Sequence, residues 1–216
     1  TVVYAHNFPL YNMLAYHLGW EDEHGEEVRT EPKGYVHSTL CLLASEAVGG
    51  ESKYALQSAA AVELVNQFSL IHSDIQDAVS ERNHRPTVWW VWGPGQAINV
   101  GDGLYALGKS SLLQLSNTKL SPHRLLKLLE LFDESCMEMC EGYYLDLTYQ
   151  ERIDVSITSY LKMASSKTGS LFACSTGAGA LTHFEDQITL KSFGEFGRKL
   201  GIAYQIRKDL AVLDNG

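Results

Sequence analysis

Apolar residues recur at helical spacing along nearly the whole chain, and no stretch alternates cleanly between apolar and polar positions. Residues 10–18 repeat apolar groups three to four positions apart, and Gly19 stands where a helix would end. Further helices are expected over residues 39–50, 53–79, 93–115, 121–147, 156–181 and 188–213. Ser121 followed by Pro122 is typical of a helix N-terminus. The pattern predicts one all-α bundle, a single domain over residues 1–216.

The composition of the 216 residues favours a soluble globular protein. Hydrophobic residues make up 45% and charged residues 20%, which allows a sizeable core. The net charge of -9 argues against a general partner such as nucleic acid or an anionic membrane. We find no apolar run that predicts a membrane span and no signal-peptide pattern at the start. Cys136 and Cys140 lie one helical turn apart and are expected to be buried thiols, in keeping with a cytoplasmic location.

The segment at residues 70–87, LIHSDIQDAVSERNHRPT, holds the first candidate site. Successive residues of a helix turn by about 100°, so Ser73, Asp74 and Asp77 share one face with Asn66. The opposite face carries Leu64, Phe68, Ile71 and Ile75. Two carboxylates alone are weak support for a Mg²⁺ site, and exposed acids near an arginine are the simpler interpretation. A diphosphate would supply the oxygen ligands that Mg²⁺ still lacks.

Basic residues follow directly. Arg82 and Arg85 have the geometry to hold phosphate with two hydrogen bonds each, or they form a basic loop that balances Glu81. The tryptophans at 89, 90 and 92 are expected to pack.

Two later segments hold further polar residues in apolar surroundings. Lys167 and Thr168 stand together in SSKTGSL, and the lysine either extends to solvent or faces a phosphate-binding cavity. Gln205, Lys208 and Asp209 lie in YQIRKDLAVLD, which by itself is typical of a solvated helix face.

Read together, these segments resemble the trans-isoprenyl diphosphate synthases over nearly the whole chain. That family reads GGKRxRP, LIHDDxxD, RRGxPT, GDxLLA, GQxxDL, KTGxLF and FQIxDD in this order. The chain has PKGYVHS, LIHSDIQD, ERNHRPT, GDGLYA, EGYYLDL, KTGSLF and YQIRKD in the same order.

The resemblance implies a helical bundle around a deep cavity and a homodimer. It implies that two aspartate-rich motifs bind Mg²⁺ with an allylic prenyl diphosphate, which assigns the metal to Asp74, Asp77 and Asp209. Arg82, Arg85, Lys167, Thr168, Gln205 and Lys208 would bind the substrate, with Asp74, Asp77 and Lys167 as the catalytic group. Phe68 and Ser69 would lie near the cavity floor. Relatives carry further helices after the point where this chain ends, so helices that close the cavity are expected to be missing from it.

The departures from the family pattern fall at ligand positions. Ser73 replaces the first acid of the first motif, and Asn83 replaces the second arginine of the pair. In the second motif Lys208 replaces an acid, and Val212 holds the last position. We hypothesise that Lys208 substitutes for part of the metal cluster; the alternative is that it points to solvent.

The family's site for isopentenyl diphosphate, the nucleophilic building block, has also changed. Its lysine, arginine and histidine positions hold Gly34, His37 and Asn66. Each lost charge-assisted bond removes roughly 1.5–3 kcal/mol of binding free energy. What remains can ionise an allylic diphosphate but lacks an evident site for the second one.

Three functions stay open. The first is a Mg²⁺-dependent lyase of the class I terpene synthase type, in which Tyr143, Tyr144 and Tyr204 either contact the carbocation or simply pack. The second is a prenyltransferase that elongates chains or prenylates another acceptor. The third is a non-catalytic subunit of an active partner.

Overall fold

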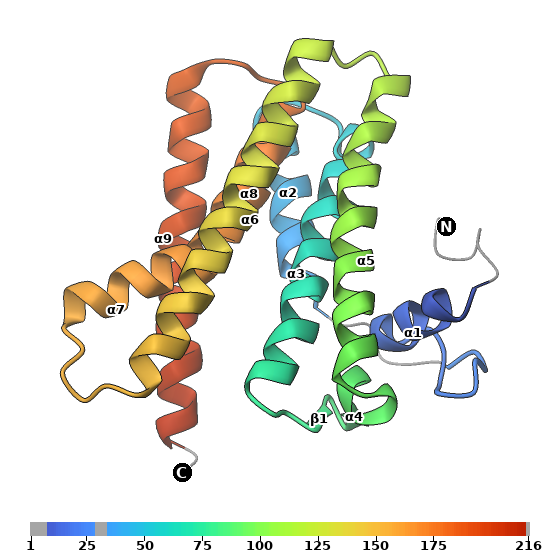
Figure 1. Cartoon of the computed structure of the whole chain (residues 1–216). Coiled ribbons are helices and arrows are strands. Elements are labelled where there is room, and N and C mark those ends of the chain that lie inside the picture. Colours follow the sequence, from blue (N-terminus) through green and yellow to red (C-terminus); the bar gives the residue numbers. More distant parts are fainter. Residues whose placement is uncertain (1–7, 29–33, 215–216) are drawn as a thin grey trace. The chain divides into compact units, whose positions relative to one another are not determined.

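The computed structural model describes residues 8–28 and 34–214, and helices dominate it (Figure 1). The chain forms two compact units. Unit 1 contains the described residues of 8–35 together with 63–110, and unit 2 contains residues 36–62 and 111–214. Two of the three boundaries fall within helices, between residues 62 and 63 and between residues 110 and 111.

The elements follow in the order that the apolar periodicity predicts, so the all-α fold class is confirmed. The helices are α1 Pro9–Leu18, α2 Val36–Ala47, α3 Leu56–Gln76, α4 Val88–Trp92, α5 Pro94–Leu113, α6 Pro122–Gln150, α7 Ile157–Ala164, α8 Ser170–Leu181 and α9 Gln187–Asp214. Short 3-10 turns cover Ser52–Tyr54 and Gln114–Asn117, and a π-helical turn covers Ser165–Gly169. None of the described helices is long and apolar enough for a membrane span.

Several predicted helix ends are confirmed. Gly19 has a φ of 79° and caps α1 in the left-handed conformation. The Ser121 hydroxyl accepts a bond from the Arg124 amide at 3.2 Å at the start of α6, and Pro122 occupies its first turn.

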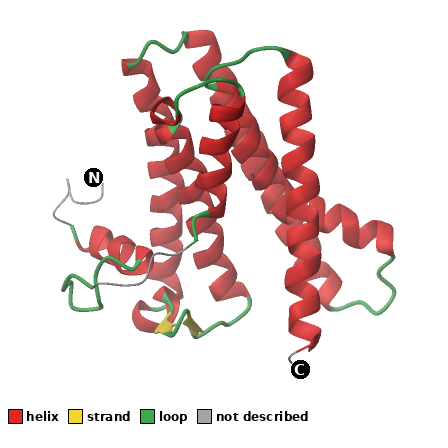
Figure 2. Cartoon of the chain, turned by 180° about the vertical axis from the view of Figure 1, so that it is seen from behind, coloured by secondary structure: helices red, strands yellow, loops and turns green. Residues whose placement is uncertain are grey.

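Two predictions about α3 and its surroundings are wrong. The expected helix over 53–79 is interrupted at Ala55 and ends at Gln76. Directly after it, strands β1 (Glu81–Arg82) and β2 (Arg85–Pro86) form an antiparallel hairpin, drawn in yellow in Figure 2. Asn83 and His84 make its two-residue turn with φ values of 52° and 59°, as a type I′ turn requires. The sequence lacks the Asn-Gly pair that normally marks this turn.

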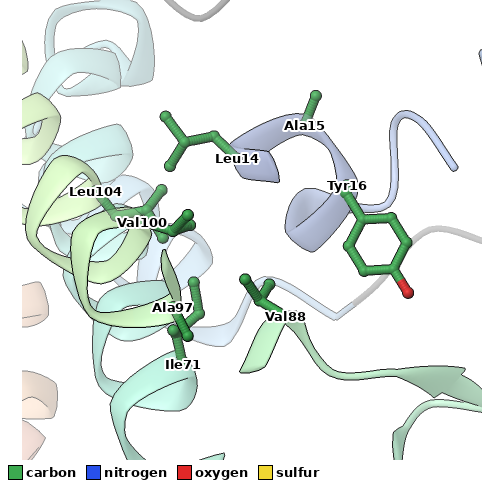
Figure 3. Packing of buried hydrophobic residues seen from close by; sticks show 8 residues of the cluster. All are labelled: Leu14, Ala15, Tyr16, Ile71, Val88, Ala97, Val100 and Leu104. Atoms are coloured by element: carbon green, nitrogen blue, oxygen red, sulfur yellow. The ribbon is translucent and has the colours of Figure 1, made fainter. Parts of the chain in front are cut away.

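The core of unit 1 is an apolar cluster at the meeting of four helices (Figure 3). The helices α1, α3, α4 and α5 contribute Leu14, Ala15, Tyr16, Ile71, Val88, Ala97, Val100 and Leu104. The predicted apolar face of α3 is confirmed, because Leu64, Phe68 and Ile75 pack against this cluster. Trp90, expected to pack, is instead 61% exposed.

The core of unit 2 is built around α8, whose twelve residues are all buried. Helices α2, α6 and α9 pack against it. Small side chains permit this close packing: a Cβ on Gly197 of α9 would lie 2.4 Å from the Phe172 carbonyl oxygen. Cys136, Cys41 and Cys174 are buried, but Cys140 is exposed, so that part of the cysteine prediction is wrong.

Candidate active site

The aspartate-rich segment lies where α3 ends in unit 1. Ala78 adopts a left-handed φ of 51°, and the Val79 amide donates back to the Asp74 carbonyl oxygen at 2.9 Å. This is a Schellman cap with alanine in the position that glycine normally fills. The cap turns the chain sharply, which leaves Asp77 exposed after the last helical residue.

Asp74 is paired with Arg82 of the hairpin. Its Oδ1 accepts bonds from Arg82 Nε at 2.9 Å and Nη2 at 2.5 Å, and the aspartate is only 3% exposed. Ser73, in the place of the missing acid, donates its hydroxyl to the Leu70 carbonyl at 3.0 Å. A positive guanidinium therefore lies beside the one buried acid of this motif.

Arg85 joins the hairpin to α1. Its Nη2 donates to the Glu21 carbonyl at 2.7 Å and its Nη1 to the Tyr16 carbonyl at 3.3 Å. The guanidinium also lies 4.3 Å from the centre of the Tyr16 ring. Burial raises the pKa of the Tyr16 phenol, which donates to the Pro86 carbonyl at 2.8 Å. These contacts stabilise the hairpin, and a phosphate-binding role for Arg85 stays a prediction.

The residues before the motif are fixed by local contacts. Phe68 meets His72 edge-on, with ring centres 4.6 Å apart. The buried Ser69 donates to the Asn66 carbonyl at 2.8 Å. The Asn66 amide donates to Glu63 at 3.0 Å. Their proposed roles at a cavity floor and a building-block site stay predictions.

In unit 2, Lys167 and Thr168 lie in the π-helical turn between α7 and α8. Two neighbouring helices approach its backbone closely. A Cβ on Gly142 of α6 would lie 2.0 Å from the Lys167 nitrogen, and one on Gly201 of α9 would lie 2.7 Å from the Gly169 Cα. The turn is therefore packed between α6 and α9. Single π turns inside helices occur frequently at functional sites.

Lys167 is paired with Asp146 of α6. Its Nζ lies 2.6 Å from Asp146 Oδ2 and 5.0 Å from the centre of the Tyr143 ring. The two charged side chains are 12% and 21% exposed, so the pair is largely shielded from water. The lysine thus faces an acid and an aromatic ring and does not extend into solvent, while its predicted contact with a phosphate stays a prediction.

Thr168, Gln205 and Asp209 form a hydrogen-bonded chain in the same unit. Thr168 Oγ1 donates to Gln205 Oε1 at 2.5 Å, and Gln205 Nε2 donates to Asp209 Oδ1 at 2.8 Å. Tyr160 of α7 donates its hydroxyl to Asp209 Oδ2 at 2.7 Å. Lys208 is exposed, and its predicted role beside the diphosphate stays a prediction.

His37 lies in the core of unit 2. Burial lowers the pKa of its imidazole to about 4, so the ring is neutral at physiological pH. Its Nδ1 lies 3.2 Å from the Ser175 hydroxyl, and its ring meets Phe172 edge-on at 4.6 Å. A neutral, core-packed imidazole is a poor replacement for an arginine that binds diphosphate.

The described residues include no group of three or more His, Cys, Asp and Glu side chains able to hold a metal. Asp74 and Asp77 are oxygen donors of the kind Mg²⁺ prefers, with a diphosphate to supply the other ligands. Asp77 is exposed, whereas Asp74 would have to give up part of its pairing with Arg82 to bind the ion. The second motif does not fit. Asp209 already accepts a bond at each oxygen, and Lys208 and the exposed Val212 beside it offer no ligand.

An all-α fold with these acids and bases in this order is that of the isoprenyl diphosphate synthases. The chain belongs to the polyprenyl synthetase family, whose model matches residues 31–214.

Among its relatives, the (2E,6E)-farnesyl diphosphate synthase of Mycobacterium tuberculosis is 36% identical over 198 residues, covering 92% of this chain and 54% of that protein. The geranylgeranyl diphosphate synthase of Methanosarcina mazei is 38% identical over 175 residues, covering 81% and 52%. The crystal structure of a polyprenyl synthetase from Streptomyces coelicolor A3(2) has a TM-score of 0.87 at 35% identity, covering 96% of this chain and 60% of that one. The chain thus spans about half the length of the curated relatives it matches.

Two partners of the candidate site residues in unit 2, Asp146 and Tyr160, were not predicted from the sequence. Asp146 lies in the EGYYLDL motif, and an acid one helical turn after Gly142 was the available signal. Tyr160 lies in a helix without a motif of its own, and only the fold brings it to Asp209.

Proposed function

We propose that the protein is a prenyltransferase that binds an allylic diphosphate and transfers its prenyl group to an acceptor. The observation that carries this proposal is the shielded Lys167 ammonium beside the hydrogen-bonded Thr168 and Gln205. Such a group can stabilise charge that develops on a leaving diphosphate. The similarity to farnesyl and geranylgeranyl diphosphate synthases supports a transferase over other enzyme classes.

In this reaction the bond between the allylic carbon and the diphosphate oxygen breaks, and the diphosphate leaves with the electron pair. The double bond of the acceptor adds to the allylic cation, and transfer of a proton to the released diphosphate restores a double bond. In unit 2, Lys167 would stabilise the leaving diphosphate by exchanging part of its present contact with Asp146. In unit 1, Arg82 would bind phosphate by exchanging part of its present contact with Asp74. Thr168 and Gln205 would orient the substrate through neutral dipoles.

Mg²⁺ would bind with the diphosphate, held by Asp74 and Asp77, and would supply further charge stabilisation.

A lyase that ionises the same substrate and quenches the cation internally is the second candidate. The observation in favour of the lyase is that the residues at the family's isopentenyl diphosphate site are uncharged. His37 is buried and neutral, Asn66 is bonded to Glu63, and position 34 is glycine. None of the three carries a charge to hold a second diphosphate.

One assay separates these functions. The purified protein is incubated with C10, C15 and C20 allylic diphosphates and Mg²⁺, with and without isopentenyl diphosphate. We expect a longer prenyl diphosphate only when isopentenyl diphosphate is present. Hydrocarbon or alcohol formed without it would favour the lyase. Turnover that begins only when a second subunit is added would favour the non-catalytic role.

Lys167→Met is the matched variant, because it keeps the length of the side chain and removes the charge. We expect turnover to fall by at least 100-fold with little change in fold. Turnover within twofold of the wild type would overturn the role of Lys167. The expected homodimer is checked by sedimentation of the same sample.

A further inference from the structure

We infer that Asp209 is not a metal ligand but the fixed end of a hydrogen-bond relay, completed by Tyr160, that orients Gln205 and Thr168 toward the substrate. The inference rests on the proposed function, because it takes Thr168 and Gln205 to face the substrate. It assigns a positioning role to Tyr160 and a changed role to Asp209.

The direction of every bond in the relay follows from the carboxylate. An ionised carboxylate only accepts hydrogen bonds, so the Gln205 atom at 2.8 Å from Asp209 Oδ1 must be its NH₂ group. The Gln205 carbonyl oxygen must then face Thr168, 2.5 Å away, and the Thr168 hydroxyl must donate to it. The threonine oxygen keeps its lone pairs for a ligand, while its proton is committed to Gln205.

Tyr160 holds the other oxygen of the carboxylate. Its hydroxyl lies 2.7 Å from Asp209 Oδ2, so the carboxyl group is fixed at both oxygens. Burial raises the pKa of the Tyr160 phenol, and the bond to Asp209 and the charge of Asp146 raise it further. The phenol therefore stays protonated and remains a donor at physiological pH.

The same contacts argue against a metal at Asp209. A Mg²⁺ ion at either oxygen would have to displace a donor, and the neighbouring positions 208 and 212 on α9 offer no further oxygen ligand. Lys208 carries a positive charge at the preceding position, and Val212, one turn on, is apolar and 69% exposed. Gln205 is 3% exposed, so the relay is shielded from the water that would compete for its bonds.

The position of Tyr160 depends on the π-helical turn. The hydroxyl comes from α7 and Thr168 from the turn that follows it, so one continuous helix supplies both ends of the relay. Asp209 and Gln205 lie one turn apart on α9 and close the relay from the other side.

The first test measures metal binding without turnover. Mn²⁺ binding in the presence of inorganic diphosphate is followed by electron paramagnetic resonance for the wild type, Asp209→Asn and Asp74→Asn. We expect Asp209→Asn to keep the stoichiometry and, within twofold, the affinity of the wild type. Asp74→Asn, the matched control, should weaken Mn²⁺ binding at least tenfold. Loss of a bound Mn²⁺ or a tenfold weaker affinity in Asp209→Asn would overturn the inference.

The second test separates positioning from binding. Asp209→Asn and Tyr160→Phe should lower kcat at least tenfold and threefold, respectively, while KM for the allylic diphosphate and the Mg²⁺ requirement stay within twofold. Unchanged kcat in both variants would refute the relay.

Thr168→Ser and Thr168→Val serve as a conservative pair. The serine keeps the hydroxyl and should retain most of the activity, and the valine should lose as much as Asp209→Asn. Equal activity of the two would also refute the relay. A wild type that turns over no allylic diphosphate would refute the proposed function alone, and the Mn²⁺ measurement would still decide the role of Asp209.

Discussion

In both regions that hold candidate site residues, a side chain of the site is bonded to a carboxylate. The two regions differ in how far apart the bonded residues lie along the chain. In unit 1, Arg82 meets Asp74 eight residues away through a tight hairpin. In unit 2, Lys167 meets Asp146 across 21 residues, and Tyr160 meets Asp209 across 49. The hairpin that follows α3 brings Arg82 to Asp74, whereas the contacts of unit 2 depend on the packing of helices that are distant in the sequence.

In both units the basic side chain is already paired with a carboxylate of the same unit. Arg82 and Lys167 are each paired with an acid, so under the proposed function a phosphate group would have to compete with Asp74 in unit 1 and with Asp146 in unit 2. Unit 2 adds a network of neutral donors that fixes geometry. In unit 1, Asp74 lies near the end of α3 and is paired with Arg82 of the hairpin, and Asp77 is exposed.

Gly142→Ala should disrupt the π-helical turn. The added Cβ would lie 2.0 Å from the backbone nitrogen of Lys167, and α9 packs closely against the other side of the same turn at Gly201. We expect the free energy of unfolding to fall by more than about 3 kcal/mol, measured by urea denaturation.

Gly194→Ala is the control for Gly142→Ala, since nothing lies within 4 Å of its Cβ position in α9. Greater helix propensity should stabilise this variant by up to about 1 kcal/mol. Equal effects of the two substitutions would mean that α6 does not hold the turn.

Acid should destabilise the protein through His37. Its pKa is lowered to about 4 in the folded state from 6.5 when solvated, so the unfolded state binds the proton first as the pH falls. The stabilisation by the neutral ring is present above pH 6.5 and is lost progressively between about pH 6.5 and 4, by about 3 kcal/mol in total.

Urea denaturation at pH 7 and pH 5 measures this loss, and His37→Gln is the control. The variant lacks the titrating ring, so its stability should change less between the two pH values than that of the wild type. The same pH dependence in both proteins would show that other groups are responsible.

Arg82→Ala should cost about 2–3 kcal/mol, because it leaves the nearly buried Asp74 without the guanidinium that donates two bonds to it. A double-mutant cycle with Asp74→Asn measures the coupling of the pair.

Arg152→Ala is the exposed counterpart of Arg82→Ala, since Arg152 and Asp154 form a paired contact in open solvent. We expect no measurable change there. If both substitutions cost the same, burial of Asp74 is not what makes the hairpin pair important.

Ala78→Gly should stabilise the end of α3 by about 1 kcal/mol, because alanine has a φ of 51° there and glycine adopts this conformation without strain. Ala203→Gly, at an exposed position inside α9, should have the opposite sign and a similar size. Destabilisation of both variants in urea would rule out strain at Ala78.

Most of the fold could be predicted from the sequence, because periodicity and caps act locally. Gly19 and Ser121 marked helix ends that the structure confirms. The hairpin was missed because Asn83 and His84 adopt a turn that usually needs glycine, and Arg82 fixes it through a contact outside the turn.

The site was predicted less completely than the fold. Each acidic or basic residue at a motif position could be identified from the sequence, but which of them form hydrogen bonds or ion pairs with one another could not. Nothing near Tyr160 in the sequence indicates Asp209, and nothing near Asp146 indicates Lys167. Such contacts depend on the packing of α6, α7 and α9, which carries no short-range signature.

The π-helical turn at Ser165–Gly169 also limits how this chain can change length. A π turn holds one more residue than the α-helical turn it replaces, so it resembles an insertion that a helix has absorbed. Deleting one residue here would restore a regular helix and rotate everything before it by about 100° relative to α8. Tyr160 would then leave Asp209, although no residue of the network had been substituted. Alignments of such chains should therefore treat a one-residue gap in this segment as a change in the site itself.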